Sequence, residues 1–152
     1  MKAHVQHLRR HDHSFSLQIY KQDFEVEYKQ DNSPLTQADK KANNIIEEGL
    51  NQLSVNFPIL SEEGKGVSYE DRKYWEYFWL VDPLDGTKEF VKKNGEFTVN
   101  IALIHKDTPV LGVVYAPALD LCYWAKQDEG AFKDGRRLPL KTENQRNTYK
   151  IV

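Results

Sequence analysis

The sequence predicts a single α+β domain with a mostly antiparallel sheet flanked by helices. Residues 36–53 have the apolar spacing of an amphipathic helix, whereas the chain after residue 75 consists of short segments rich in aromatic and β-branched side chains. These later segments follow one another closely, and short connections favour hairpins over parallel crossovers. A chain of 152 residues can bury a hydrophobic core without disulfides or a structural metal.

Composition and charge limit the possible classes of function. The chain has 21 Lys and Arg against 23 Asp and Glu, so it lacks the basic field that binds nucleic-acid polymers. No apolar run approaches the roughly 20 residues of a transmembrane segment, and no signal peptide is recognisable. The single Cys122 cannot form an internal disulfide, which is typical of a reducing compartment. We therefore expect a cytoplasmic protein, with peripheral association with the inner membrane as an alternative.

The first 16 residues differ from the rest of the chain. They contain four of the five histidines in a stretch with few apolar residues: His4, His7, His11 and His13. A histidine-rich tract can bind metal, but this pattern is more typical of a disordered terminus. Residues 15–20 are expected to end a short helix, and the alternation of apolar and charged residues over 23–29 predicts a strand.

The clearest predicted element is a helix from Thr36 to about Leu53. Ser33 and Pro34 interrupt the preceding pattern, and Thr36 is expected to act as the N-cap. The apolar positions follow the spacing of one buried stripe: Ala38, Ala42, Ile45, Ile46, Leu50 and Leu53.

The later part of the chain has the pattern of β-strands. Asp134-Gly135 predicts a tight turn, and residues 148–152 resemble the start of another strand. Residues 61–73 have the composition of a loop. The predicted strands are rich in aromatic and branched side chains and are separated by turn signals: 75–81, 97–104, 109–115 and 121–125.

Three acidic clusters sit at predicted junctions between elements. In the first, Glu62 and Glu63 follow the apolar run 57–60, so that the end of a strand would present both carboxylates at an edge. In the second, residues 36–39 (Thr-Gln-Ala-Asp) are close to a capping box. Their functional interpretation is that Asp39 accepts a proton from a hydroxyl that is bonded to an attacking water. The residues alone leave both interpretations open.

The third cluster, residues 82–87 (Asp-Pro-Leu-Asp-Gly-Thr), is the most specific. Its proline is expected to end the preceding strand because proline cannot donate a ladder hydrogen bond, and its glycine permits a sharp turn. Its two aspartates and the leucine carbonyl form an all-oxygen set that suits Mg²⁺ better than Zn²⁺. A helix beginning near Thr87 would also direct its first amides toward an anion such as phosphate. An ordinary turn with Thr87 as N-cap explains the same residues, and spacing alone favours neither interpretation.

These motifs resemble those of the inositol monophosphatase superfamily. Residues 79–87 match its pattern apolar-apolar-Asp-Pro-apolar-Asp-Gly-Thr at every fixed position. Residues 61–64 resemble its upstream Glu-Glu motif, and residues 33–39 resemble its Ser-Pro-x-Thr-x-x-Asp segment. Within the superfamily, residues 88–90 and 94–104 are similar to the CysQ-like group of 3′(2′),5′-bisphosphate nucleotidases.

The resemblance implies a Mg²⁺ site that activates a water molecule and neutralises phosphate oxygens. Glu63 is expected to support the metal ligands, while Lys88 and Glu89 fit either nucleotide recognition or an ordinary surface. The implied metal ligands are oxygen atoms of four residues: Glu62, Asp82, Leu84 through its carbonyl, and Asp85.

The resemblance also implies a catalytic pair and a phosphate site. Thr87, polarised by Asp39, would help Glu62 to orient the water for in-line attack. The backbone N–H groups of Gly86 and Thr87 would hold the substrate phosphate.

The resemblance covers residues 17–152 and implies the N-terminal, metal-binding half of the sugar-phosphatase (inositol monophosphatase-like) fold. The second domain of the family, which supplies a further Asp ligand and most of the nucleoside contacts, has no counterpart here. We expect an exposed apolar domain boundary through which the chain self-associates.

The implied reaction is hydrolysis of 3′-phosphoadenosine 5′-phosphate to AMP and phosphate. Two alternatives remain open. One is an inositol monophosphatase or another small phosphomonoesterase of the same superfamily. The other is an inactive fragment that binds metal or nucleotide.

Overall fold

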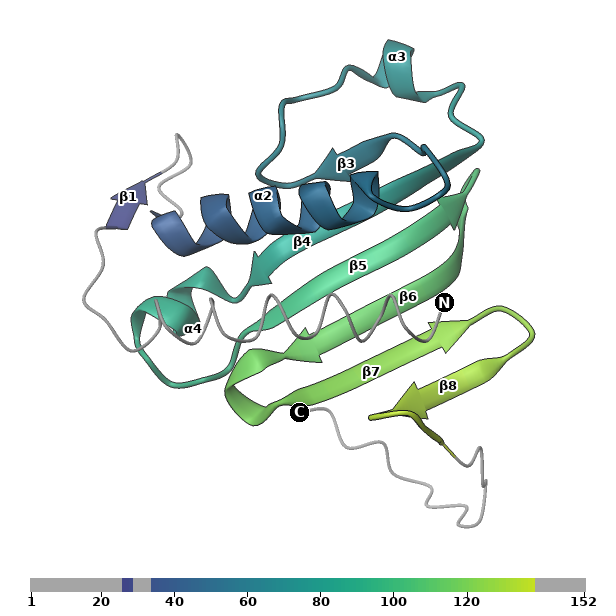
Figure 1. The fold of residues 1–152 in the computed structure, drawn as a ribbon. Coiled ribbons are helices and arrows are strands. Elements are labelled where there is room, and N and C mark those ends of the chain that lie inside the picture. The colour runs from purple at the N-terminus through teal and green to yellow at the C-terminus, as the bar shows by residue number, and fades with distance from the viewer. Residues whose placement is uncertain (1–25, 29–33, 139–152) are drawn as a thin grey trace, which may run out of the picture.

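The computed structural model describes residues 26–28 and 34–138 (Figure 1). Its elements in chain order are β1 (Val26–Tyr28), β2 (Pro34–Thr36), α2 (Gln37–Asn51), β3 (Ile59–Ser61), α3 (Tyr69–Arg72), β4 (Tyr77–Asp85), α4 (Thr87–Val91), β5 (Thr98–His105), β6 (Thr108–Ala116), the 3₁₀ helix η1 (Pro117–Leu119), β7 (Leu121–Lys126), β8 (Gly130–Lys133) and β9 (Arg136–Arg137).

The strands from β3 onward form one seven-stranded sheet in the order in which they occur along the chain. β3 and β4 pair in parallel, and every later pair in this sheet is antiparallel. β1 and β2 form a separate antiparallel pair, and α2 lies across one face of the large sheet (Figure 1). The predicted α+β class with a mostly antiparallel sheet is confirmed.

Helix α2 packs its apolar stripe against the sheet, as its spacing predicts. Ala38, Ala42, Ile46 and Leu50 are buried, while the intervening Asn44 is exposed. The helix begins at Gln37, directly after Thr36, the residue for which the sequence predicts the N-cap position and which ends β2. None of the described helices is both long and apolar enough to cross a bilayer. The main core joins α2 to four strands: Ile46, Leu50, Trp79, Val81, Val99, Ile101, Tyr115 and Cys122.

Strand β4 continues beyond Pro83, where the sequence predicts its end. Asp82 pairs with Asn100 and Asp85 pairs with Thr98, so three steps along β4 match two steps along β5. The extra residue is a β-bulge, which accommodates a proline that has no N–H to donate. The predicted strand end was wrong because pairing resumes once the bulge has absorbed the proline.

The predicted hairpin region is confirmed in β5, β6 and β7. Lys133 pairs with Arg136 across the predicted turn, in which Asp134 and Gly135 have φ angles of +47° and +81°. Positive φ at both central positions is the geometry of a type I′ turn, whose twist matches that of the flanking strands. The first predicted strand of this region, 75–81, begins at Tyr77.

Two short elements interrupt segments for which the sequence predicts irregular structure. Residues 34–36 form β2 at the break that the sequence predicts around Pro34. Within the predicted loop 61–73, α3 forms one helical turn, and the Ser68 hydroxyl at its start accepts a hydrogen bond from the Asp71 amide. β1 confirms part of the predicted strand 23–29. The predictions for residues 1–16, 15–20 and 148–152 lie outside the described residues.

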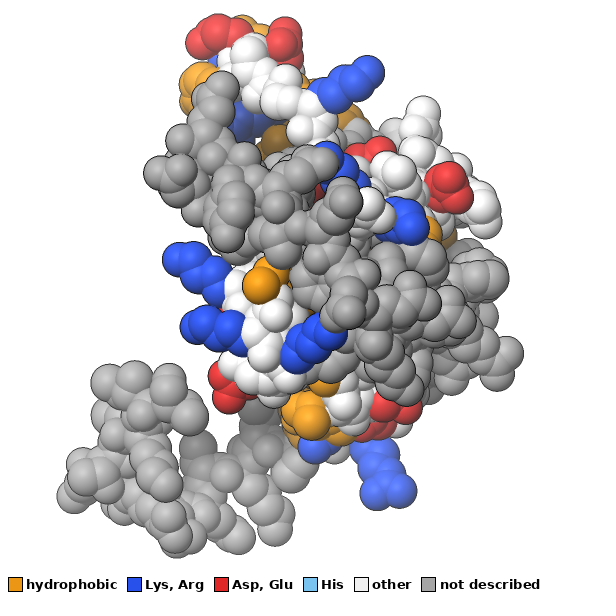
Figure 2. Space-filling model, turned by 90° about the vertical axis from the view of Figure 1, so that its left-hand side faces the viewer, with side chains coloured by type: hydrophobic (Ala, Val, Ile, Leu, Met, Phe, Trp, Pro, Cys, Tyr) orange, Lys and Arg blue, Asp and Glu red, His pale blue; other side chains and the backbone are white. Residues whose placement is uncertain are grey.

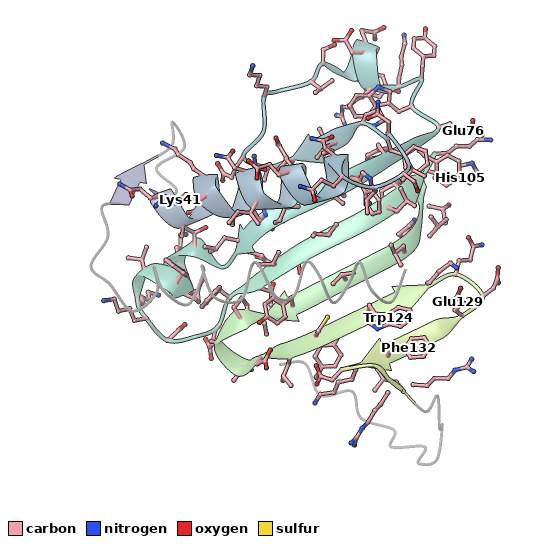
Figure 3. All side chains as sticks on the ribbon, in the orientation of Figure 1. Lys41, Glu76, His105, Trp124, Glu129 and Phe132 are labelled. Carbon is pink, nitrogen blue, oxygen red and sulfur yellow. The ribbon has the colours of Figure 1, made fainter. Side chains whose placement is uncertain are left out.

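The two ends of the sheet carry different kinds of side chain: charged groups are seen at the first end, near Lys41 (Figure 2), and stacked rings lie at the second end, near His105. In Figure 3, Lys41 on α2 and the Glu76–His105 pair mark its opposite ends. At the second end, the ring of Tyr77 stacks between His105, at 4.3 Å, and Phe57, at 5.2 Å between centroids. Seen from the first end, Lys and Arg side chains stand apart from one another, and acidic side chains occur above and below them (Figure 2). The well-mixed charge of the sequence is therefore also mixed on this side of the molecule.

Candidate active site

The three acidic motifs meet at one end of the sheet, where β3 and β4 end and α2 begins. Since β3 and β4 are parallel, with Ser61 opposite Val81, their carboxyl ends lie side by side and bring Glu62 beside Asp82. The Glu62 amide donates a hydrogen bond to the Val81 carbonyl at 3.0 Å, which fixes the backbone of the first motif to the second. The predicted strand ending at the Glu-Glu motif is thus present as β3.

The turn between β4 and α4 requires glycine at position 86. Gly86 has φ +92° and ψ +40°, in the left-handed region, and forms the N-cap of α4. A Cβ atom at this position would lie 2.8 Å from the backbone oxygen of Glu96. Both the backbone conformation and this close approach exclude a side chain, so the turn places Thr87 at the first position of the helix.

Thr87 connects the turn to α2. Its hydroxyl lies 3.2 Å from Asp39 Oδ1 and 3.2 Å from the carbonyl oxygen of Leu84, and it donates its single proton between these two acceptors. The interpretation of Thr87 as an N-cap is wrong, because Gly86 holds that position and the hydroxyl bonds outside its own helix. Asp39 is only 2% exposed, so the acceptor of this hydrogen bond is buried, while Thr87 is half-buried.

The carboxylates around β4 are close enough to repel one another. The pKa of Asp82 is raised to about 6, mainly because the carboxyl group is partly buried and additionally because the negative charges of Glu62 and Asp85 lie close to it. The amide of Leu84 donates to Asp82 Oδ1 at 3.2 Å and opposes the shift. A bound cation would relieve this repulsion.

The donor set at this end of the sheet fits Mg²⁺ in kind. Across residues 26–28 and 34–138, no three Asp, Glu, His or Cys side chains stand in an arrangement that holds a metal ion by themselves. Mg²⁺ is commonly held by one or two carboxylates while water and substrate phosphate complete its shell. Glu62, Asp82 and Asp85, together with the Leu84 carbonyl, supply only oxygen donors. Among the described residues, these side chains by themselves do not form a closed protein cage for a metal ion.

Of the remaining residues singled out by the sequence, Glu89 has a defined partner. Its carboxylate lies 3.9 Å from Lys92 Nζ, one turn later on α4. Lys88 is exposed and Glu63 is half-buried. The ion pair within α4 favours a surface role for Glu89.

A polar network on α2 was missed by sequence reasoning. The Ser61 hydroxyl donates to Asn43 Oδ1 at 2.5 Å, and Asn43 Nδ2 donates to Glu47 Oε1 at 2.9 Å. Asn43 and Glu47 follow Asp39 by four and eight positions and so occupy the same side of the helix. That spacing was the available signal. Through Ser61, the network ties the end of β3 to α2 immediately before Glu62.

The acidic end of the sheet opens into a groove on the face away from α2. The groove has a volume of about 610 Å³, and the side chains of Leu80 and Val114 beside it are each 44% exposed. Its apolar lining comes mainly from β3, β4, β5 and β6, and its polar lining includes Glu62, Asp82 and Asn100. Asn100 was also missed by sequence reasoning.

Comparison with known proteins identifies the family. The model of the inositol monophosphatase family matches residues 13–151. The CysQ 3′(2′),5′-bisphosphate nucleotidase of Salmonella typhimurium is 51% identical over 140 residues, which are 90% of this chain and 56% of the relative. The corresponding protein of Escherichia coli K12 is 48% identical over 130 residues, covering 84% and 52%.

Solved structures agree with these matches. CysQ of Bacteroides thetaiotaomicron superposes with a TM-score of 0.69 at 46% identity, covering 88% of this chain and 48% of that one. The suhB protein of Bartonella henselae superposes with a TM-score of 0.77 at 30% identity, covering 90% and 52%. The chain spans about half the length of the curated relatives it matches. Its sequence motifs, its fold and these similarities show that the chain belongs to the inositol monophosphatase family.

Proposed function

We propose that this chain carries the metal-binding and catalytic groups of a 3′(2′),5′-bisphosphate nucleotidase, which hydrolyses 3′-phosphoadenosine 5′-phosphate to AMP and phosphate with Mg²⁺. The observation that carries the proposal is the contact of Thr87 Oγ1 with Asp39 Oδ1, at 3.2 Å, beside the carboxylates of β4. The names of the CysQ relatives support the substrate class, at 48–51% identity.

The proposed metal ligands are Glu62, Asp82, Asp85 and the carbonyl of Leu84. A bound divalent cation supplies positive charge that lowers the pKa of water and neutralises phosphate oxygens. The chain itself keeps the ligands in place: the Val81 carbonyl holds the backbone of Glu62, and the Leu84 amide holds Asp82.

The proposed catalytic residues are Asp39, Thr87 and Glu62. Asp39 is a buried acceptor for the Thr87 hydroxyl, and a hydroxyl that donates to a carboxylate is a better acceptor for the proton of a water molecule. Glu62 would hold the same water from the β3 side. Correct placement of the water lowers the barrier by fixing the direction of attack on phosphorus.

The proposed phosphate site is the backbone at the start of α4. The first N–H groups of a helix have no acceptor within the helix. Gly86 caps α4 and Thr87 begins it, directly after the carboxylate cluster, so an anion held by their amides would lie beside the proposed cation.

The reaction is tested by phosphate release from 3′-phosphoadenosine 5′-phosphate, with and without Mg²⁺. Two proteins are compared: this chain, and a chimera that continues residues 1–152 with the remaining part of the Salmonella CysQ protein. We expect Mg²⁺-dependent release by the chimera, abolished by Asp82→Asn. Absence of release by a folded chimera, while intact Salmonella CysQ is active, would contradict the proposal.

The same assay separates the alternatives. Faster release from an inositol monophosphate than from the nucleotide would assign the site to an inositol monophosphatase. Activity of the chimera together with silence of the 152-residue chain would make this chain alone an inactive binding fragment.

We further propose that the protein is cytoplasmic and that it self-associates through the sheet face away from α2, where the groove lies. Cys122 is the single cysteine of the sequence and is buried, which supports a reducing location. The exposed Leu80 and Val114 support an apolar contact. Light scattering coupled to size exclusion tests the association. A monomer at all accessible concentrations would contradict it.

A further inference from the structure

Asn100 lies on β5 directly opposite Asp82 and lines the groove beside Glu62. Its Nδ2 atom donates a hydrogen bond to Asp85 Oδ2 at 3.1 Å. Its Oδ1 atom is buried and has no hydrogen-bond partner within the part of the chain that the structure describes. Asn100 therefore binds one proposed metal ligand, Asp85, through its amide nitrogen and lies opposite a second, Asp82, in the strand pair.

The chemistry of the neighbouring side chains restricts what can satisfy this oxygen. Ionised carboxylates only accept hydrogen bonds, so Glu62, Asp82 and Asp85 offer no donor to a carbonyl. A buried acceptor without a donor costs free energy, and such groups in native proteins commonly contact a bound water or ion. A hydrated cation suits the carboxylates and the amide oxygen together.

We infer that Asn100 is part of the cation site: Nδ2 fixes the carboxylate of Asp85, and Oδ1 is a neutral oxygen donor for Mg²⁺ or for its water shell. The inference rests on the proposed Mg²⁺ site and extends it to β5. An amide at this position adds an oxygen without adding a fourth negative charge to a cluster that already repels itself.

Asn100→Leu tests the inference, because leucine has a similar size and no polar atoms. Mg²⁺ is titrated into the full 152-residue chain by calorimetry, and the melting temperature is measured without Mg²⁺. We expect at least about tenfold weaker Mg²⁺ binding. The melting temperature should be unchanged or higher, because the unsatisfied oxygen is removed. Asn44→Leu is the matched control on the exposed side of α2 and should leave Mg²⁺ binding unchanged.

A purely structural role of Asn100 predicts the opposite pair of results, a lower melting temperature with unchanged Mg²⁺ affinity, and that outcome would overturn the inference. The wild-type chain provides a second measurement that does not depend on the variant folding. Added Mg²⁺ should shift the side-chain amide NMR signals of Asn100 and leave those of Asn44 in place. Equal signals for Asn100 with and without Mg²⁺ would also overturn it.

Asp82→Asn distinguishes failure of this inference from failure of the proposed site. If Asp82→Asn abolishes Mg²⁺ binding while Asn100→Leu does not weaken it, only the role of Asn100 is rejected. If the wild-type chain binds no Mg²⁺, both are rejected.

Discussion

The two sides of the candidate site are built on different physical principles. On the α2 side, buried polar groups are joined by direct hydrogen bonds: Asp39, 2% exposed, accepts from Thr87, and Asn43, 6% exposed, accepts from Ser61. On the groove side, partly exposed carboxylates of like charge lie near each other, and the pKa of Asp82 is raised to about 6.

This difference indicates that the α2 side stabilises the folded protein and that the groove side binds the cation. A satisfied buried hydrogen bond contributes to stability, whereas neighbouring like charges cost stability until a cation neutralises them. Substitutions on the α2 side should therefore lower the free energy of unfolding. Substitutions on the groove side should raise it or leave it unchanged while weakening Mg²⁺ binding.

The largest expected effect on stability comes from Phe90→Ala, because this change removes a core side chain that packs against residues on both sides of the site. Phe90 is fully buried under the β4–α4 turn, with its ring edge-on to Phe97 at 5.0 Å and close to Ala38 and Leu84. The free energy of unfolding should fall by about 3–4 kcal/mol. Urea denaturation measures it, and a loss below about 1 kcal/mol would show that this small core does not hold the turn.

Asn43→Ala breaks the α2 side alone. It leaves the Ser61 hydroxyl without its acceptor in a half-buried position, so stability should fall by about 1–2 kcal/mol. Mg²⁺ affinity should change little, because the network touches no proposed ligand side chain. Asn44→Ala, the exposed neighbour on the same helix, is the control. Equal stability of the two variants would remove the distinction between the two sides.

Asp82→Asn, on the groove side, should raise the free energy of unfolding where Asn43→Ala lowers it. Since the folded pKa of about 6 lies above the ordinary 3.8, the folded protein binds an extra proton between about pH 4 and pH 6. Ionisation of Asp82 therefore lowers the free energy of unfolding, and this loss is absent below about pH 4 and complete above about pH 6. After allowance for solvent screening, the variant should be more stable by about 1 kcal/mol at pH 7.5 without Mg²⁺, and no more stable at pH 4.

Urea denaturation at both pH values measures this gain, and calorimetry should show that the variant no longer binds Mg²⁺. A variant that is less stable at pH 7.5 would mean that Asp82 belongs to the stabilising side.

Thr87→Ala should have the smallest effect on stability, about 1 kcal/mol, because Thr87 is itself half-buried and its single hydroxyl proton is shared between the two acceptors. Turnover by the CysQ chimera should nevertheless fall by about 100-fold while Mg²⁺ affinity is retained. Thr87→Ser keeps the hydroxyl and should keep most of the activity. Full activity of Thr87→Ala would reduce Thr87 to a structural link between α4 and α2.

Much of this arrangement could be predicted from local patterns. The apolar spacing over residues 36–53 predicts α2 within two residues at each end, and Asp134-Gly135 predicts the β8–β9 turn. The motif at residues 82–87 marks the carboxylate cluster because all its members are adjacent in the chain. The end of β4 was mispredicted since the effect of Pro83 depends on whether a neighbouring strand can accommodate a bulge.

The sequence by itself determined the family, the fold class and the identity of the acidic groups, because each depends on residues close together in the chain. Only the tertiary structure decided which groups meet. The parallel β3–β4 pair brings Glu62 to Asp82, the β4–β5 register brings Asn100 to Asp85, and the packing of α2 brings Asp39 to Thr87 and Asn43 to Ser61: contacts across 15 to 48 residues. Helical and strand periodicity specify the face on which a side chain lies, whereas its partner is set by register and packing between separate elements.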